Sequence, residues 1–331
     1  MNKEYDPFST KPISCYMEDF VEIGEGIRTS WVLKDFLPFG GKMLIWGDTN
    51  AGKSPLMATL AHSIITGKPF LRKFPVCQGN VAYMMMPDMA FDEWRDRWKK
   101  WKENDMMPPK GTFLTHYHFT NARIDEVADR IRKLGSKALP EEMEWISDLR
   151  KHNASVVFID VLSETHQLDS SDGLTPTKIY DSWRLICGNR PGLVFVHHDK
   201  KPFHATTTGK KLDDAKHSFS GHMGWLNLVS GGIHIDNPGD LKYFISLEKA
   251  RNTPKTTFPV SLNLDTMLFD IGDNKWAKAW TMLERGEEPD MVMKKIADRN
   301  FDIGKASKVI NQIRDVMEAQ VEMRRFELKA V

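Results

Sequence analysis

Residues 47–54 read Gly-Asp-Thr-Asn-Ala-Gly-Lys-Ser, a complete G-x-x-x-x-G-K-[ST] phosphate-binding loop. An apolar run at 42–46 precedes the loop and predicts a strand, and residues 55–65 follow with the pattern of a helix. In this strand-to-helix context the glycines permit a tight turn, and the backbone N–H groups of the loop face inward to hold phosphate oxygens. We therefore expect the chain to bind a nucleoside triphosphate.

The last two residues of the loop carry most of its chemistry. We expect Lys53 to reach the β- and γ-phosphates and the Ser54 hydroxyl to ligate Mg²⁺. The other residues of the loop are expected to line the nucleotide site, and they are Gly47, Asp48, Thr49, Asn50, Ala51 and Gly52. The expected cofactors are ATP and Mg²⁺.

The rest of the chain alternates apolar runs with helical patterns. Strands are expected at 81–86, 113–119, 155–160 and 193–198, with helices near 91–103, 124–134, 141–152 and 178–187. Apolar strands alternating with helices predict an α/β fold, with a mostly parallel sheet covered on both faces. Closely spaced strands at 232–235, 242–247 and 257–262 predict an antiparallel edge, and charged helical segments follow at 289–300 and 304–330. We expect an N-terminal arm (1–28), a core (29–285) and a C-terminal helical extension (286–331).

Charge and cysteine content narrow the class of protein. Across 331 residues, 46 basic and 45 acidic side chains give a net charge of +1, which argues against a strongly cationic nucleic-acid coat. The chain has three cysteines and none forms a C-x-x-C pair, which fits a reducing compartment with no disulfide framework and no cysteine-rich zinc site. No apolar run approaches the roughly 20 residues of a membrane span, and the N-terminus lacks the apolar stretch of a signal peptide. We expect a cytoplasmic protein with no membrane partner.

Three acidic or imidazole side chains lie at or just beyond the carboxyl ends of expected strands, the edge of the sheet where open α/β folds bind ligands. Asp160 is expected to hold Mg²⁺ together with Ser54, and the alternative is an aspartate that caps the next loop. His198 either senses the γ-phosphate by hydrogen bonding or is a structural histidine. Asp88 is a candidate for orienting the attacking water.

Several of these segments together resemble the RecA-like ATPases. The resemblance rests on 47–54, on 156–160 and on Val196-His197-His198-Asp199-Lys200-Lys201. The chain is most similar to the plasmid RepA-type hexameric replicative helicases, whose stretch after the phosphate-binding loop resembles residues 62–70. The similarity covers roughly residues 30–265. It implies a RecA-like fold and an ATPase that assembles as a ring, with a hexamer favoured. It also implies action on single-stranded DNA, with replication or recombination proteins as further partners.

The resemblance also implies a site shared between subunits. Lys249 and Arg251 resemble the family's Lys-x-Arg pair, which reaches the γ-phosphate bound by the neighbouring subunit. Two residues apart on a strand, they would project from the same face and stabilise charge on the transferred phosphoryl group. The alternative is a solvated, charged edge strand.

One position departs from the family. The group usually carries a catalytic glutamate after the second strand, where this chain has Pro87 followed by Asp88. Asp88 either activates water from its shifted position or leaves a slow ATPase that works as a nucleotide-dependent switch. Glu164 is a second candidate for the missing carboxylate.

Two groups of residues are candidates for nucleic-acid contact. RecA-like proteins hold single strands with loops that leave this edge of the sheet, and the lysines after His198 suit phosphate contacts. These are Lys200, Lys201, Lys210 and Lys211, and the alternative is an exposed charged loop. Trp94, Trp98 and Trp101 share a helix face and could stack bases, although their spacing favours packing in the core or at a subunit interface.

Two other functions remain open at this point. One is a non-motor recombination mediator or DNA-binding switch that hydrolyses ATP slowly. The other is a P-loop small-molecule kinase, which would work as a monomer and need no Lys-x-Arg pair.

Overall fold

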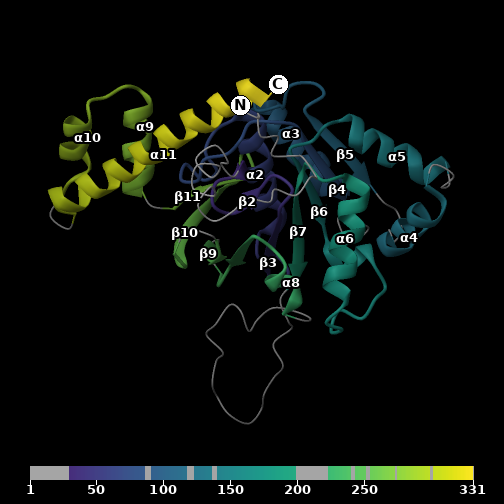
Figure 1. Ribbon diagram of the computed structural model, residues 1–331. Helices are drawn as coiled ribbons and strands as arrows, with labels where there is room; N and C mark the ends of the chain where they lie inside the picture. Colours follow the sequence, from purple (N-terminus) through teal and green to yellow (C-terminus); the bar gives the residue numbers. More distant parts are fainter. Residues whose placement is uncertain are drawn as a thin grey trace, which may run out of the picture.

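The computed structural model describes residues 30–85, 91–117, 123–135, 140–198, 223–239, 243–250, 254–272, 274–298 and 301–330. Within these residues, nine strands form one sheet in the order β11-β10-β9-β8-β3-β7-β6-β4-β5 (Figure 1). The strands from β8 to β5 are parallel, whereas β9, β10 and β11 pair antiparallel at one edge. The predicted α/β fold, mostly parallel with antiparallel edge strands, is confirmed.

The parallel strands coincide closely with the apolar runs of the sequence. They are β3 (Lys42–Gly47), β4 (Val81–Met85), β5 (Phe113–Tyr117), β6 (Val156–Asp160), β7 (Gly192–His198) and β8 (Gly231–Asp236). Every residue of β4 and β6 is buried, as expected for strands with helices on both faces. Residues 86, 118 and 119, which were expected to extend two of these strands, lie outside the described residues.

The antiparallel strands have a different burial pattern. They are β9 (Tyr243–Lys249), β10 (Thr256–Asn263) and β11 (Leu268–Ile271). In β9, Tyr243, Ile245 and Leu247 are buried while Phe244 is exposed, so one face of this part of the sheet meets solvent. The sequence did not predict β11, because four residues directly after a turn carry little periodicity.

Helices cover both faces of the sheet, and two apolar clusters result. Met43 and Ile45 of β3 belong to the cluster on the face of α2 (Lys53–Thr66) and α3 (Phe91–Glu103). Leu44 and Trp46 belong to the cluster on the other face, whose helices are α4 (Ile124–Leu134), α5 (Pro140–Lys151), α6 (Thr175–Cys187) and α8 (Gly224–Asn227). The alternation along β3 follows from the two-residue repeat of a strand.

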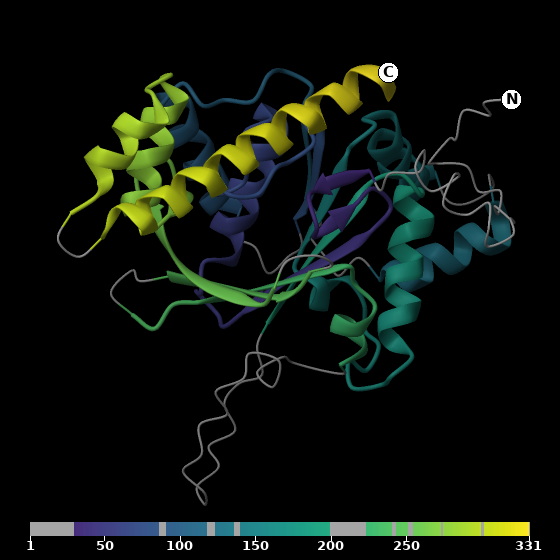
Figure 2. The same cartoon turned by 60° about the vertical axis from the view of Figure 1, so that its left-hand side comes forward.

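The C-terminal helices are α9 (Asn274–Glu284), α10 (Pro289–Ile296) and α11 (Ile303–Ala330). They pack on one another, and α11 lies diagonally across the molecule (Figure 2). Their buried side chains join the same apolar cluster as α2. The sequence analysis missed α9, and α10 ends four residues before the expected end because Ala297 adopts an extended conformation.

The start of the described chain forms a small ribbon beside the sheet. Strand β1 (Trp31–Leu33) pairs antiparallel with β2 (Leu37–Pro38). Residues 1–28, predicted as an arm, lie outside the described residues, and the predicted domain boundaries remain predictions. No helix in the described part of the chain is both long and apolar enough to cross a bilayer.

Candidate nucleotide-binding site

The phosphate-binding loop connects the end of β3 to the start of α2. A Cβ atom on Gly47 would lie 2.2 Å from the carbonyl oxygen of Ile235 in β8, so only glycine fits there. Gly52, just before the helix, has a φ of 95°, in the left-handed region that favours glycine. The two glycines of the motif are therefore required by packing and by backbone conformation respectively.

The motif lysine is buried and folded back over its own loop. The Nζ of Lys53 donates hydrogen bonds to the carbonyl oxygens of Gly47, at 3.1 Å, and Asp48, at 2.7 Å. A phosphate oxygen is a stronger acceptor for an ammonium group than a neutral carbonyl. The lysine is thus held at the loop, where a bound phosphate can attract it.

Asp160 lies beside the loop, as predicted, and accepts two hydrogen bonds on one oxygen. Its Oδ2 accepts from the Oγ of Ser54 at 3.1 Å and from the hydroxyl of Tyr83 at 2.9 Å. Burial raises the pKa of Asp160, while these two hydrogen bonds and the charges of Lys53 and Arg97 act in the opposite direction.

The donor atoms at this point fit a magnesium ion. Ser54 and Asp160 bring a hydroxyl and a carboxylate together, and Mg²⁺ prefers oxygen ligands. The described residues contain no group of three or more His, Cys, Asp or Glu side chains that could hold a metal ion. Two protein oxygens suit Mg²⁺, which is usually held by one or two carboxylates, substrate phosphates and water. When bound, the ion would neutralise charge on the phosphates.

His198 lies next to the phosphate-binding loop. It pairs with Gly47 in the register of β7 and β3, so the last residue of one strand is level with the first glycine of the motif. The side chain is half-buried. The register of the strands brings His198 beside Gly47, and the sensing role stays a prediction.

Lys249 lies away from the phosphate-binding loop of its own chain. It pairs with Gly232, which in turn pairs with Leu44, three residues before Gly47 in β3. Strand β9 runs away from the loop, and the Nζ of Lys249 donates to the carbonyl oxygens of Leu226 and Asn227 in the same chain. Its role at a neighbouring subunit stays a prediction.

Other predicted site residues fall outside the described residues. These are Asp88 with the preceding Pro87, Arg251, and the four lysines Lys200, Lys201, Lys210 and Lys211. Glu164 is half-buried in η2 (Leu162–Thr165), just beyond β6.

The tryptophan stripe belongs to the core. Trp94 and Trp101 are buried, and the indole of Trp101 donates to the carbonyl oxygen of Thr266 at 2.8 Å. Trp98 packs against the same cluster and is partly buried. The preference for packing over base stacking is confirmed.

Two residues near Asp160 escaped the sequence analysis. Tyr83 lies within the apolar run of β4, so the sequence pattern indicated only a strand and no role for its hydroxyl. Arg97 lies three residues after Trp94 and four before Trp101, so it shares the face of the tryptophans and is almost fully buried, at 4% exposure. A charged residue in register with an apolar stripe was the signal that could have revealed it.

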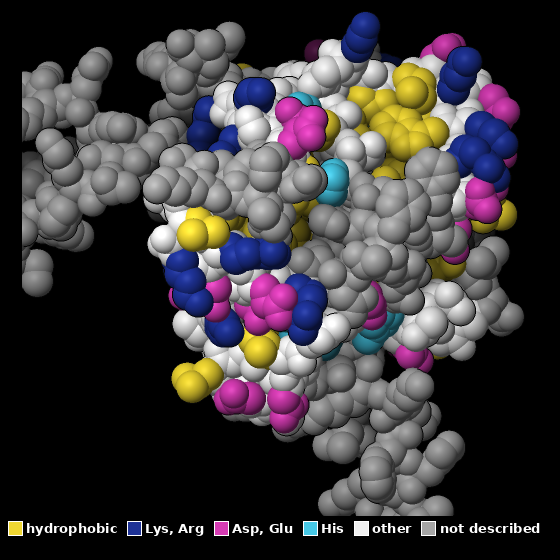
Figure 3. All heavy atoms as spheres, turned by 90° about the vertical axis from the view of Figure 1, so that its right-hand side faces the viewer, with side chains coloured by type: hydrophobic (Ala, Val, Ile, Leu, Met, Phe, Trp, Pro, Cys, Tyr) yellow, Lys and Arg dark blue, Asp and Glu magenta, His cyan; other side chains and the backbone are white. Residues whose placement is uncertain are grey.

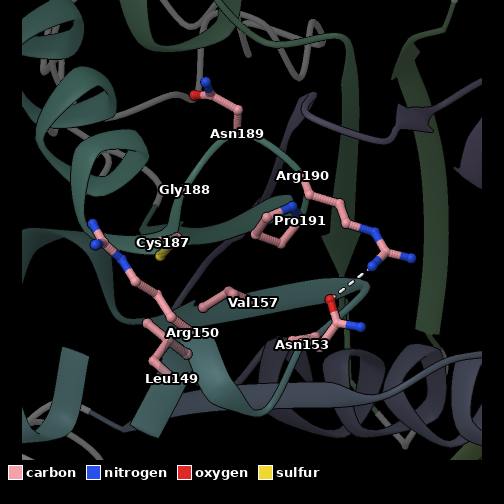
Figure 4. A pocket seen from close by; sticks show the side chains of 10 residues that line it. Leu149, Arg150, Asn153, Val157, Cys187, Gly188, Asn189, Arg190 and Pro191 are labelled. Atoms are coloured by element: carbon pink, nitrogen blue, oxygen red, sulfur yellow. Dashed lines mark hydrogen bonds between the residues drawn. The ribbon is translucent and has the colours of Figure 1, made fainter. Parts of the chain in front are cut away.

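A separate pocket lies at the opposite end of the sheet. It is bounded by Asn153 just before β6, Pro191 just before β7 and Cys187 at the end of α6 (Figure 4). Arg190 donates to the side-chain oxygen of Asn153 at 2.7 Å, and burial raises the pKa of the Cys187 thiol to about 12. A protonated thiol is a poor nucleophile, so this pocket offers little for catalysis.

The face around α4 and α5 carries charges of both signs. Figure 3 shows lysine and arginine side chains lying beside aspartate and glutamate there. On α4, Arg132 pairs with Asp129 at 2.7 Å, and Arg123, just before the helix, pairs with Glu126 at 3.1 Å. The described side chains of this face therefore carry both signs, whereas a nucleic-acid-binding surface is typically basic.

The fold and the site together define a class: a P-loop NTPase on a mostly parallel α/β sheet, with a glycine loop, a lysine and a buried aspartate at the carboxyl ends of the strands. A family model described as an AAA domain (AAA_25) matches residues 19–202, more than half of the chain. The chain belongs to this AAA domain family, and a P-loop ATPase of this kind uses ATP and Mg²⁺ in general.

Among solved structures, a KaiC-like protein from the hyperthermophilic archaeon Pyrococcus horikoshii matches with a TM-score of 0.44 and 12% identity. The match covers 74% of this chain and 97% of that one. No curated protein matches the sequence.

Proposed function

We propose that this protein is an oligomeric ATPase that couples ATP binding and hydrolysis to single-stranded DNA binding or translocation. The proposal combines the family membership with the narrower resemblance to plasmid RepA-type replicative helicases. The observation that carries it is the position of His198, which is level with Gly47 and is directly followed by the lysine-containing segment. A histidine in this place can sense the γ-phosphate and pass its loss to a DNA-binding loop.

The position of Lys249 supports a site completed by a neighbouring subunit. Strand β9 carries Lys249 away from the loop that holds Lys53. A cation placed there is poorly located for its own nucleotide and suits the nucleotide of an adjacent copy. In a ring, each interface would then contain Lys53, Ser54 and Asp160 from one subunit and Lys249 and Arg251 from the next.

The test is the ATPase rate with and without single-stranded DNA, measured beside the native mass of the protein. The proposal expects an oligomer whose turnover is stimulated by single-stranded DNA, with an affinity that falls as salt rises. DNA-independent turnover by a monomer would reject it and favour a small-molecule kinase.

A second candidate, an ATP-dependent switch or recombination mediator, is favoured by one specific observation. The chain has Pro87, followed by Asp88, where the resembling family has a catalytic glutamate. A strand-unwinding assay separates the two, because a mediator binds DNA in an ATP-dependent manner without directional unwinding.

A further inference from the structure

Arg97 is a buried cation in the aromatic cluster beneath the nucleotide site. Its guanidinium carbon lies 4.4 Å from the ring centre of Trp94, and the Trp94 ring lies 4.5 Å from that of Tyr83. A cation over an indole face gains cation–π energy. That attraction is smaller than the cost of removing a full charge from water, so the burial of Arg97 requires a nearby anion.

The guanidinium has hydrogen-bonding capacity left over. Its Nε and Nη1 are buried, and neither has an acceptor within hydrogen-bond distance in the described chain. Burial lowers the pKa of Arg97, while Tyr83, Asp160 and Glu93 act in the opposite direction. Glu93 is exposed and Tyr83 is neutral when protonated, so Asp160 is the buried anion among these neighbours.

Tyr83 connects this cluster to Asp160 directly. Its hydroxyl donates to the Oδ2 atom of Asp160 at 2.9 Å, and the Oγ of Ser54 donates to the same atom. An ionised carboxylate oxygen can only accept, so the Tyr83 hydroxyl is the donor in this hydrogen bond. Two donors on one oxygen fix the rotation of the carboxylate before any ion arrives.

We propose that Tyr83 and Arg97 are positioning residues for the metal-binding carboxylate of Asp160, Tyr83 fixing its orientation and Arg97 supplying the buried counter-charge. This inference rests on the ATPase role proposed above. Outer partners of this kind tune a metal site without touching the metal or the substrate.

The first test measures the Mg²⁺ dependence of nucleotide binding, with a fluorescent ADP and the full-length chain. Tyr83→Phe and Arg97→Met should each raise the Mg²⁺ concentration at half-saturation by about 10-fold or more, as other outer partners do. Nucleotide binding without Mg²⁺ should be unchanged, because the loop and Lys53 are intact. Wild-type Mg²⁺ dependence in both variants would overturn the proposal.

Two matched variants separate charge from packing. Arg95→Met removes the same side chain from the exposed side of the same helix, where Arg95 pairs with Asp92 at 2.7 Å, and should leave the Mg²⁺ dependence unchanged. Arg97→Lys keeps the charge and should restore most of the Mg²⁺ affinity lost in Arg97→Met. Equal loss in the Lys and Met variants would assign Arg97 a packing role and contradict the proposal.

The second test needs no ligand. If Arg97 is the counter-charge of Asp160, Arg97→Met should lower the melting temperature much less in an Asp160→Asn background than in the wild type. Equal decreases in both backgrounds would show that the pair is uncoupled and would overturn the inference. Should the wild-type chain bind no nucleotide, the proposed function fails, and this cycle alone decides on the Arg97–Asp160 pair.

Discussion

The carboxyl and amino ends of the parallel strands form two opposite edges of the sheet, and at each edge a cation donates to backbone carbonyl oxygens. The phosphate-binding edge is the one formed by the carboxyl ends. At the phosphate-binding edge, Lys53 donates to two carbonyls of its own loop. At the opposite edge, the Arg184 guanidinium donates to the carbonyls of Gly188, Asn189, Pro191, Gly40 and Gly41. A cation saturated by fixed carbonyls ties the ends of α6 and the neighbouring turns together, whereas one held by a loop can turn toward a phosphate. We therefore expect Arg184 to stabilise the fold and Lys53 to bind phosphate.

The largest effect should come from the phosphate-binding edge. Lys53→Ala removes the group expected to stabilise charge on the phosphates, so ATP turnover should fall by about 100-fold or more. Thermal unfolding should change little, since the hydrogen bonds from Lys53 to the carbonyls of Gly47 and Asp48 have a modest net value. A variant that hydrolyses ATP normally would break the functional assignment of this edge.

The matched change at the opposite edge should show the reverse pattern. Arg184→Met leaves several carbonyls without their charged donor, and the free energy of unfolding should fall by about 3–4 kcal/mol. The folded fraction should bind nucleotide as the wild type does. Chemical denaturation measures the free energy of unfolding, and a nucleotide titration on the same sample measures the nucleotide affinity. A weaker nucleotide affinity would contradict a purely structural role for Arg184.

A third change tests whether the C-terminal helices belong structurally to this core. Gln320 of α11 accepts from the backbone N–H of Val76 at 2.8 Å and donates to its carbonyl at 2.7 Å. Gln320→Leu leaves both backbone groups buried without a partner and should cost about 2 kcal/mol. Protection of α11 in hydrogen exchange should fall with it, and unaltered protection would argue for attachment through apolar contacts alone.

The smallest effect concerns acid stability at the phosphate-binding helix. Burial lowers the pKa of His62 on α2 to about 4, and the charge of Lys68 acts in the same direction. In the unfolded chain His62 is protonated near pH 6.5, whereas in the folded chain it is protonated only near pH 4. The free energy of unfolding should therefore decrease as the pH falls from 6.5 to 4. His62→Gln should remove about 1 kcal/mol of that decrease after screening is considered. Superimposable stability–pH curves for the two proteins would contradict this.

The sequence revealed the parts of the site that interrupt a regular pattern. Asp160 and His198 are the last residues of two apolar strands. The carboxyl ends of parallel strands lie at the same edge of a sheet, so the proximity of both residues to Gly47 followed from the topology. Tyr83 was hidden because its ring fits the apolar run of β4 and only its hydroxyl acts at the site. Arg97 was hidden by its distance along the chain from Asp160, since burial of a lone charge depends on tertiary packing.

The parallel strands of the fold were also predictable from the sequence, whereas one of the C-terminal helices was not. Buried parallel strands have continuous apolar runs, which single-sequence periodicity detects well. The helix α9 was missed although Trp276, Ala279 and Trp280 lie on one face, because its partners α10 and α11 follow it along the chain. Its buried face becomes meaningful only once those helices pack against it.

The central claim is an ATPase site completed by a neighbouring subunit, and ATP turnover of Arg251→Ala, measured beside its ATP affinity, tests it most directly. The account predicts that hydrolysis is abolished while ATP binding stays at the wild-type level. Wild-type turnover in this variant would contradict the shared site.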